Sequence, residues 1–438
     1  MKPKHVWLLA FLMMLGLCRQ SLGADIRELQ ARRQHAAHLF SDGVLLLHAK
    51  TERELTADGY REEAAFYYLT GLENAPGTIL AIAGKRGETW LFVPPEEKKA
   101  DAMRTPAAEL PSVGIDHVAD WKDLQSFLAA QGKVGAKFYY QPDVAMLPRN
   151  LSALGDNRAP GWIQELKRNF PLAEFQPVRV KLNTLLTVES PAEQAVSREA
   201  ARATAAAFMA GMLAIHPGVS QRHVELAVVD ACWREARGVS FWPWAMAGIH
   251  GVFPRPFESL TRYDHLNSTM QAGDLVRLDV GCEWQHYQGD FGRTVPVSGH
   301  FSQEQREVWN TFVAAYQAVA RELKVGLTED RAFDIWKAEL LRHREAVKSA
   351  LAQQAIATWS EPKNVPYWQM HTMNLDAGYI EGPLRAGMVI DFEPIASIGG
   401  QGYYLEDMFL IGSANAEVLT PGLPYTAEEI EAAMSRPR

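Results

Sequence analysis

The alternation of hydrophobic and polar residues changes along the chain and divides it into two regions. In the first region, helical stretches mix with short β-rich runs such as 78–82 and 89–93, and glycine and proline separate these runs. Runs of this length and composition are typical of strands. The pattern predicts a compact α/β domain at 24–178, a linker within Phe170–Leu182 and a second domain at 179–438.

The second region opens with a strong helix-start signal at Ser190–Glu193. The serine suits the cap, the proline suits the first helical position, and the glutamate can reach back to the cap. The predicted helix runs to about Ile215, and another begins at Ser220. A similar cap recurs at Ser302 and Gln305. Two helix pairs, each followed by strand-like runs, indicate a domain built from two similar halves.

Two aspartates interrupt the strand-like runs that follow the first helix pair. Asp279 lies in the run 274–281, and Asp290 follows eleven residues later. A hairpin that turns at Trp284-Gln285 places them directly opposite each other, with Cβ atoms about 5 Å apart. Like charges this close destabilise a strand pair unless a cation lies between them. Taken alone, this spacing favours two solvated hairpin acids, so a metal site requires further ligands.

Further ligand types follow toward the carboxyl terminus: His371, Glu393 and Glu406. Each glutamate interrupts an apolar run, and a buried carboxylate must be paired, protonated or metal-bound. The alternative is that both glutamates face solvent on edge strands. Four carboxylates and one neutral imidazole carry four negative charges, which two divalent cations neutralise. The residues therefore predict a binuclear metal centre formed by Asp279, Asp290, His371, Glu393 and Glu406.

Composition limits the classes of partner. The chain has 438 residues, of which 47% are hydrophobic, which is enough to form the cores of two or three domains. Its formal net charge is -8, whereas binding to a polyanion needs a clustered basic surface. We therefore expect no nucleic-acid partner.

The first residues have the pattern of an export signal. Two lysines precede an unbroken apolar run at 6–17, and small residues follow it. This predicts a signal peptide at 1–23, cleaved after Gly23 or Ala24, and a periplasmic or extracellular protein. Cys18 offers a lipoprotein alternative, which the bulky residue before it disfavours. The apolar run is shorter than the roughly 20 residues that span a bilayer, so no stable membrane anchor is expected.

Only two cysteines remain after the predicted cleavage, Cys232 and Cys282. Two are too few for a disulfide framework. We expect both to be buried, small apolar residues. Neither lies in a recognisable catalytic motif, and no serine has an elbow-type setting, so nucleophilic catalysis finds no support.

Four stretches of the sequence resemble the pita-bread metallopeptidases, the group that contains aminopeptidase P, prolidase and methionine aminopeptidase. LDVGCEWQHYQGDFGRTVPVSGHFS at 278–302 resembles the first metal motif of that family, and LRAGMVIDFEP at 384–394 and LEDMFLI at 405–411 resemble the last two. YREEAAFYYLTG at 60–71 resembles the amino-terminal domain of aminopeptidase P. The resemblance implies an α/β fold, with a small aminopeptidase P-type domain followed by a pita-bread catalytic domain.

The resemblance also implies roles for the five ligands. Asp279 chelates one metal, His371 and Glu393 hold the other, and Asp290 and Glu406 bridge both. A shared hydroxide attacks the scissile carbonyl, and Glu393 assists proton transfer. Oxygen ligands with a single nitrogen and no thiolate suit manganese, and they also tolerate cobalt, iron or zinc. Family members often form dimers or tetramers, so we expect a homo-oligomer.

The sequence departs from the family pattern around the metals. Gly378 and Tyr367 stand where further histidines are usual, and Tyr404 stands where an arginine is usual. The proton-shuttling histidine of the family aligns with Arg262 without a gap, or with His265 if three residues are skipped. The two tyrosines either donate hydroxyl hydrogen bonds in place of the missing groups or only pack.

Two other residues remain open candidates. Asp391 lies on the same strand face as Glu393 by period two, and it is either a supporting acid beside the ligands or an acid at a strand end. His250 lies in a loop rich in aromatic residues and proline, 241–257. It either lines the substrate cleft or has a structural role, and the structural role is favoured.

Together these features predict an exopeptidase that cleaves the Xaa-Pro bond at the amino terminus of short peptides. One alternative is an Xaa-Pro dipeptidase of the prolidase type, which would cleave dipeptides and not tripeptides. A second alternative is a metal-bound binding module without catalysis, and the absent histidines favour it. The intact ligand set favours an enzyme.

Overall fold

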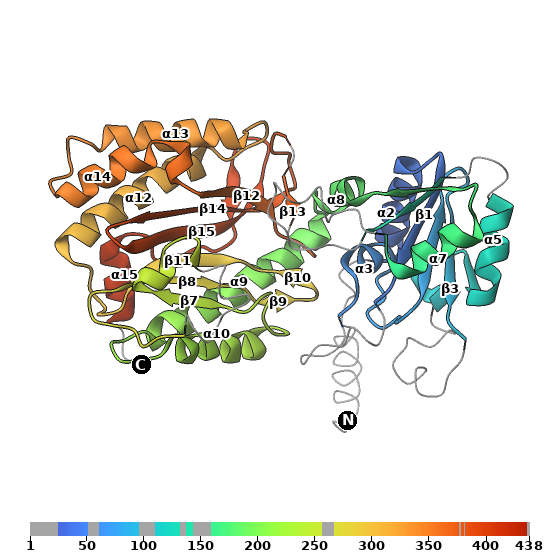
Figure 1. The fold of residues 1–438 in the computed structure, drawn as a ribbon, viewed down its shortest axis with the longest axis horizontal. Helices are drawn as coiled ribbons and strands as arrows, with labels where there is room; N and C mark the ends of the chain where they lie inside the picture. The colour runs from blue at the N-terminus through green and yellow to red at the C-terminus, as the bar shows by residue number, and fades with distance from the viewer. Residues whose placement is uncertain are drawn as a thin grey trace, which may run out of the picture. The chain divides into compact units, whose positions relative to one another are not determined.

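The computed structural model describes residues 25–50, 61–95, 110–131, 137–142, 159–255, 267–375, 378–380 and 382–435 (Figure 1). The chain divides into an amino-terminal unit, Met1–Leu185, and a carboxyl-terminal unit, Leu186–Arg438. The predicted signal peptide lies outside the described residues. No helix within the described ranges is both long enough and apolar enough to cross a bilayer.

The amino-terminal unit contains a six-stranded mixed sheet in the order β4-β3-β2-β1-β5-β6. Its strands are β1 (Gly43–His48), β2 (Ile79–Ala83), β3 (Glu88–Val93), β4 (His117–Asp120), β5 (Lys137–Tyr140) and β6 (Glu174–Pro177). Its helices are α2 (Ile26–Leu39), α3 (Ala64–Thr70), α5 (Leu124–Gln131) and α7 (Gly161–Asn169). This confirms the predicted α/β character of the region, including both β-rich runs.

The segment expected to be a linker is part of the folded structure. Within Phe170–Leu182 the chain forms β6, which pairs in parallel with β5, and then enters α8 (Arg179–Leu186). Phe175 of β6 packs against Phe138 of β5, with ring centroids 5.2 Å apart. The segment is therefore fixed by strand pairing and by apolar contact. The two prolines in it favoured a linker in the sequence analysis.

The carboxyl-terminal unit is built on an antiparallel sheet in the order β13-β12-β14-β15-β11-β8-β7, with β16 paired to β15. The strands are β7 (Trp244–Ala247), β8 (Leu275–Val280), β11 (Phe291–Pro296), β12 (Tyr367–Thr372), β13 (Gly378–Tyr379), β14 (Val389–Ile398), β15 (Gln401–Ile411) and β16 (Ala416–Val418). A small hairpin of β9 (Glu283–Trp284) and β10 (Tyr287–Gln288) extends β8 and β11.

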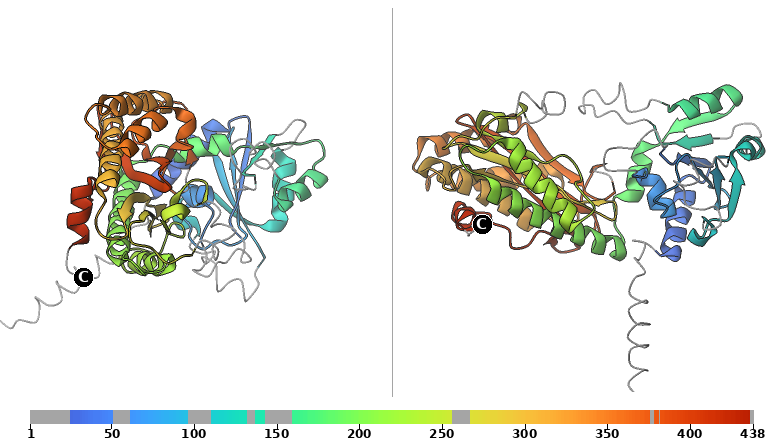
Figure 2. Two further views of the ribbon diagram at one scale, coloured as in Figure 1. Left: turned by 60° about the vertical axis from the view of Figure 1, so that its left-hand side comes forward. Right: turned by 90° about the horizontal axis from the view of Figure 1, so that it is seen from below.

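The helices of this unit are α9 (Pro191–Ala214), α10 (Gln221–Glu235), α12 (Gln303–Glu322), α13 (Glu329–Arg342), α14 (Ala350–Trp359) and α15 (Ala427–Met434). Both predicted capping boxes are present, at Ser190 with Glu193 and at Ser302 with Gln305. Figures 1 and 2 show α9 and α10 beside β7 and β8, and α12 and α14 beside β14 and β15.

The sheet packs against these helices through one apolar face. Phe208 of α9 meets Phe291 of β11 edge-on, with ring centroids 4.6 Å apart. Tyr316 of α12 stacks on Phe392 of β14, with ring centroids 4.8 Å apart. Because successive strand residues point to opposite faces, the residues between these apolar positions form the other face, which carries the polar groups described below.

A disulfide joins Cys232 of α10 to Cys282, which follows β8. The expectation that both cysteines are buried is confirmed, but they are bonded to each other and are not two separate apolar side chains. Packing of α10 against the sheet brings their Cα atoms to 5.2 Å, a separation that suits a disulfide. Both residues are fully buried. A count of cysteines cannot reveal this pairing, because it depends on two elements that are distant in sequence.

We expect this disulfide to contribute to stability by constraining the unfolded chain. It closes a sequence separation of 50 residues, for which the loop-entropy relation gives about 4 kcal/mol as an upper figure. The double variant C232A/C282A should unfold at lower denaturant concentration than the wild type. Reductant should lower the wild-type midpoint and leave the variant unchanged. Equal midpoints for the oxidised wild type and the variant would contradict this role.

Candidate metal centre

The hairpin that carries the two aspartates has a different register from the predicted one. Asp279 of β8 stands opposite Gly292 of β11, and the two-residue turn lies at Gln285–His286, where both φ angles are positive. A turn with two positive φ angles is type I′, which asparagine and glycine usually form. The predicted turn at Trp284-Gln285, and with it the direct pairing of Asp279 with Asp290, is wrong.

Asp290 nevertheless lies on the same side of the sheet as Asp279. It precedes Gly292 by two residues, and side chains two positions apart in an extended chain share a face. Gly292 pairs with Asp279 on one neighbouring strand and with Glu406 of β15 on the other. Three carboxylates therefore surround one glycine, the residue without a side chain of its own.

Glu393 and His371 complete the set from β14 and β12. The pairs Phe392↔Asp407 and Ile395↔Tyr404 place Glu393 opposite Glu406. His371 Nε2 lies 3.3 Å from Glu393 Oε1 and 3.6 Å from Glu406 Oε1. The structure thus brings all five predicted ligands to one face of the sheet.

The tightest cluster of candidate ligand atoms includes a residue outside the predicted set. One ligand atom from each of Asp290, His371, Asp391 and Glu406 lies within 4.8 Å of the other three. Asp391 enters because it pairs directly with His371 across β12 and β14. Its position two residues before Glu393 was visible in the sequence, whereas its closeness to His371 depends on strand register.

Burial makes these carboxylates difficult to ionise in the absence of a cation. It raises the pKa of Asp279 to about 8, against the opposing influence of Arg277, and raises the pKa of Glu393 to about 7. Burial lowers the pKa of the His371 imidazole, but hydrogen bonds to Glu393 and Glu406 outweigh that effect and raise this pKa well above its usual value. The metal-free site therefore retains protons that cations would displace.

The donor set fits divalent cations. Within the described part of the chain, Asp290 Oδ1 and Glu406 Oε1 are buried atoms without a hydrogen-bond partner. Buried carboxylate oxygens without donors are costly, and a coordinated cation removes that cost. Oxygen ligands with one imidazole and no thiolate are typical of manganese and related divalent ions.

Arg277 is a site residue that the sequence analysis missed. Its Nη2 lies 2.8 Å from Asp279 Oδ2, and only 2% of the side chain is exposed. The guanidinium carbon lies 4.3 Å from the centroid of the Tyr404 ring. The available signal was a charged residue in an apolar strand, on the same face as Asp279 by period two. The buried cation offsets part of the negative charge of the cluster.

The two tyrosines at the family-variant positions have different surroundings. Tyr404 is fully buried, and its hydroxyl donates a hydrogen bond to Glu406 Oε2. Gly292 makes room for it, since a Cβ at that position would overlap the Tyr404 ring. Tyr367 lies at the start of β12, partly buried, with its ring 6.3 Å from that of Phe253. Of the two tyrosines, Tyr404 contacts a predicted metal ligand, Glu406.

The remaining candidates are Arg262, His265, His250 and Gly378. Arg262 and His265 fall outside the described residues. His250 lies in a 3-10 turn, with Nδ1 3.2 Å from Ser268 Oγ and 3.3 Å from Gln221 Oε1, contacts that suit the structural role. Gly378 begins β13 and pairs with β12.

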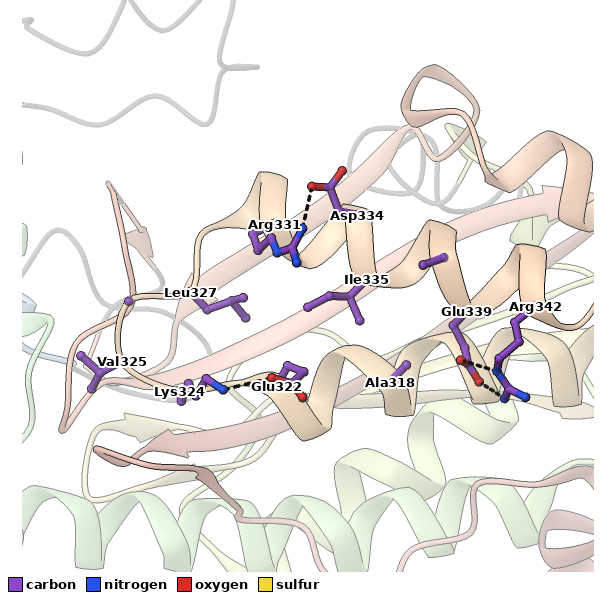
Figure 3. A pocket seen from close by; sticks show the side chains of 12 residues that line it. Ala318, Glu322, Lys324, Val325, Leu327, Arg331, Asp334, Ile335, Glu339 and Arg342 are labelled. Atoms are coloured by element: carbon purple, nitrogen blue, oxygen red, sulfur yellow. Dashed lines mark hydrogen bonds and ion pairs between the residues drawn. The ribbon is translucent and has the colours of Figure 1, made fainter.

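A groove between α12 and α13 is separate from this cluster (Figure 3). Its charged side chains form ion pairs: Arg331 with Asp334, Arg342 with Glu339, and Lys324 with Glu322. No predicted site residue lines it. The groove therefore adds nothing to the metal centre.

Carboxylates and one histidine gathered on the polar face of an antiparallel sheet form a candidate metal centre of the kind that metal-dependent hydrolases use. Residues 195–413 match the model of metallopeptidase family M24, and residues 29–139 match the aminopeptidase P, N-terminal domain. The chain belongs to metallopeptidase family M24. The predicted family, fold class and metallo-aminopeptidase class are confirmed.

Individual relatives agree with this assignment. The chain is 25% identical to the Xaa-Pro aminopeptidase of Escherichia coli over 441 residues, covering 93% of this chain and 97% of the relative. It is 27% identical to the Xaa-Pro dipeptidase of Pyrococcus horikoshii over 271 residues, covering 59% and 70%. A solved structure of Escherichia coli aminopeptidase P matches with a TM-score of 0.71 at 23% identity, covering 94% and 98%.

The raised pKa values give the metal-free protein a pH-dependent stability. Asp279 and Glu393 titrate at about 8 and about 7 when folded, above their values of about 4 in an unfolded chain. Their contribution is fully present below about pH 4 and is lost as the pH rises through the folded values. We therefore expect the thermal midpoint of chelator-treated protein to fall between about pH 5 and pH 8.

Added manganese should raise the midpoint most at the higher pH, because fewer protons then compete for the ligands. Scanning fluorimetry with and without the metal measures both effects. The matched variant Asp279→Asn should show a weaker pH dependence without metal. A midpoint that rises with pH in metal-free wild type would contradict the assignment.

The space above Gly292 gives a second test of the centre. In Gly292→Ala, the new Cβ overlaps the Tyr404 ring and must displace its hydroxyl from Glu406. Overpacking of this kind costs about 1–3 kcal/mol, and manganese binding should weaken as Glu406 loses its donor. The control is Gly161→Ala, where a Cβ meets nothing within 4 Å. Wild-type stability and metal affinity in Gly292→Ala would overturn this description of the site.

Proposed function

We propose that this protein is a binuclear metal-dependent exopeptidase that hydrolyses the Xaa-Pro bond at the amino terminus of short peptides. The observation that carries the proposal is the gathering of all five expected ligands on one sheet face, with buried oxygens that lack donors. The similarity to an Xaa-Pro aminopeptidase over 93% of the chain supports the choice of bond.

Two bound divalent cations would supply an activated water and polarise the scissile carbonyl. Manganese suits the oxygen-rich ligand set best. Asp279, Asp290, His371, Glu393 and Glu406 would hold the two ions. The four carboxylates among them balance the charge of two cations, which supports a pair of ions over a single one.

The protein side chains would position the reactants and move the proton. Glu393 would accept a proton from the attacking water and deliver it to the leaving nitrogen, a general acid–base role that a positioned carboxylate can fill. Tyr404 holds Glu406 through its hydroxyl. Arg277 holds Asp279 through its guanidinium. These two contacts fix the carboxylates whose orientation the chemistry needs.

We further propose that the protein is exported and that residues 1–23 are its signal peptide. The disulfide between Cys232 and Cys282 supports this, because disulfides persist in oxidising compartments and are rare in reducing ones. A homo-oligomer remains an expectation drawn from the family.

Peptide hydrolysis tests the proposed reaction. The mature protein with added manganese should cleave Xaa-Pro-Xaa tripeptides and leave matched peptides without proline intact. The variant Asp290→Ala should lose at least about 100-fold in rate, because it removes a predicted bridging ligand. Release of the amino-terminal residue is followed by chromatography.

Other outcomes would favour the alternatives. Cleavage restricted to Xaa-Pro dipeptides would indicate a dipeptidase, the activity named for the Pyrococcus horikoshii relative. Two bound ions per chain without any cleavage would indicate a binding module that retains the fold and the metals.

A further inference from the structure

Asp391 is a buried acid that the expected ligand set leaves without a role. It is the third residue of the ten-residue strand β14, and its side chain is fully buried. The interpretation of Asp391 as simply an acid at a strand end is therefore excluded. Neither of its carboxylate oxygens has a hydrogen-bond partner among the described residues.

A neighbouring strand shows how this fold treats a buried structural acid. Asp407 of β15 is also fully buried, but it accepts hydrogen bonds from three donors. These are Arg293 at 2.8 Å, the Thr420 hydroxyl at 2.8 Å and the Tyr425 hydroxyl at 2.9 Å. Asp391 has no comparable donors, and protonation would still leave its second oxygen unsatisfied.

A supporting role beside His371 is also disfavoured. An acid that orients a metal-binding histidine accepts a hydrogen bond from the ring nitrogen that does not face the metal. Here His371 Nε2 faces Glu393 and Glu406, and Nδ1 lies 3.4 Å from the carbonyl oxygen of Thr372. Asp391 receives neither ring proton, although one of its oxygens lies within 4.8 Å of ligand atoms of His371, Asp290 and Glu406.

We propose that Asp391 is a sixth protein ligand of the metal centre, coordinating the ion that His371 binds. This inference rests on the proposed function, because it adds a ligand to the same pair of ions. A cation satisfies both the burial of Asp391 and its lack of donors, and carboxylate is a ligand that manganese prefers.

The positive charge of Arg277 offsets the negative charge that a fifth carboxylate adds to the cluster. With Asp391 the cluster carries five carboxylates, and the buried guanidinium at Asp279 returns the net protein charge to minus four. Two divalent cations neutralise that charge. The extra acid and the extra base thus compensate each other across the same sheet face.

Metal titration of Asp391→Asn tests this assignment. The amide has nearly the same shape as the carboxylate but no charge, and it is a weaker ligand. Loss of a group that only supports a ligand typically weakens metal binding by about 10- to 100-fold. In isothermal titration with MnCl₂, we expect the dissociation constant of one of the two ions to rise by at least that factor. The surface control Glu417→Gln, which removes an exposed carboxylate, should bind as the wild type does.

Cobalt spectroscopy separates direct ligation from a structural effect. The visible absorption of bound Co²⁺ responds to coordination number, so its intensity and band positions should change in Asp391→Asn. If that variant does not fold, Asp391→Ser removes the carboxylate with a smaller side chain. Wild-type manganese affinity together with a wild-type cobalt spectrum in the variant would overturn the proposal.

The wild-type stoichiometry tests the proposed function separately. Two ions bound to the wild type, with no change in the variant, would refute Asp391 as a ligand and leave the binuclear centre standing. A single ion bound to the wild type would refute the binuclear centre, and the variant would still show whether Asp391 coordinates that ion. No bound ion in the wild type would refute both.

Discussion

Like charges buried next to one another are the constraint on which the carboxyl-terminal unit depends. Asp279, Glu406 and Glu393 stand in one row across β8, β15 and β14, and repulsion between unscreened carboxylates at such spacing destabilises a sheet. The structure opposes this cost by three means. It supplies a guanidinium from Arg277 and a hydroxyl from Tyr404, and it gathers carboxylate oxygens without donors where cations would bind.

The row of residues beside the carboxylates contains a guanidinium although the arginine usual in the family is replaced. Tyr404 occupies a position where the resembling family has arginine, and Arg277 brings a guanidinium to the same row from β8. Thr294 lies between them, since it pairs with Arg277 and its hydroxyl accepts a hydrogen bond from the Tyr404 backbone at 2.8 Å. The positive charge is therefore present at the site but arises from a different strand.

Much of the fold could be predicted from local signals. The capping boxes at Ser190 and Ser302 depend on residues three apart, and both are present. Asp279, Glu393 and Glu406 could be predicted as ligands because each interrupts an apolar run. Asp290 and His371 lie in no such run, and they were predicted from their order along the chain and the resemblance to the family. The register of the hairpin could not be predicted, because Gln285 and His286 adopt positive φ angles that their residue types seldom favour.

The errors share a physical origin in contacts between elements distant in sequence. The disulfide requires α10 to pack against the end of β8, and the roles of Arg277 and Asp391 depend on which groups the neighbouring strands present. Asp391 and Asp407 illustrate the limit: both are acids in apolar runs, and period two places Asp391 on the face of Glu393 but cannot show whether either acid has hydrogen-bond donors. Only their surroundings show that one is satisfied by three donors and the other has none.

Side chains alternate between the two faces of each strand, and the two faces differ in how much sequence change they tolerate. The face toward the helices requires apolar volume, which many combinations of residues supply, as in the packing of Phe208 on Phe291. The opposite face requires particular atoms at particular positions, because a misplaced carboxylate is both a lost ligand and an uncompensated charge. A fold can therefore tolerate the sequence difference seen here, where the chain is 25% identical to a relative over 93% of its length, as long as the polar face keeps its atoms in place.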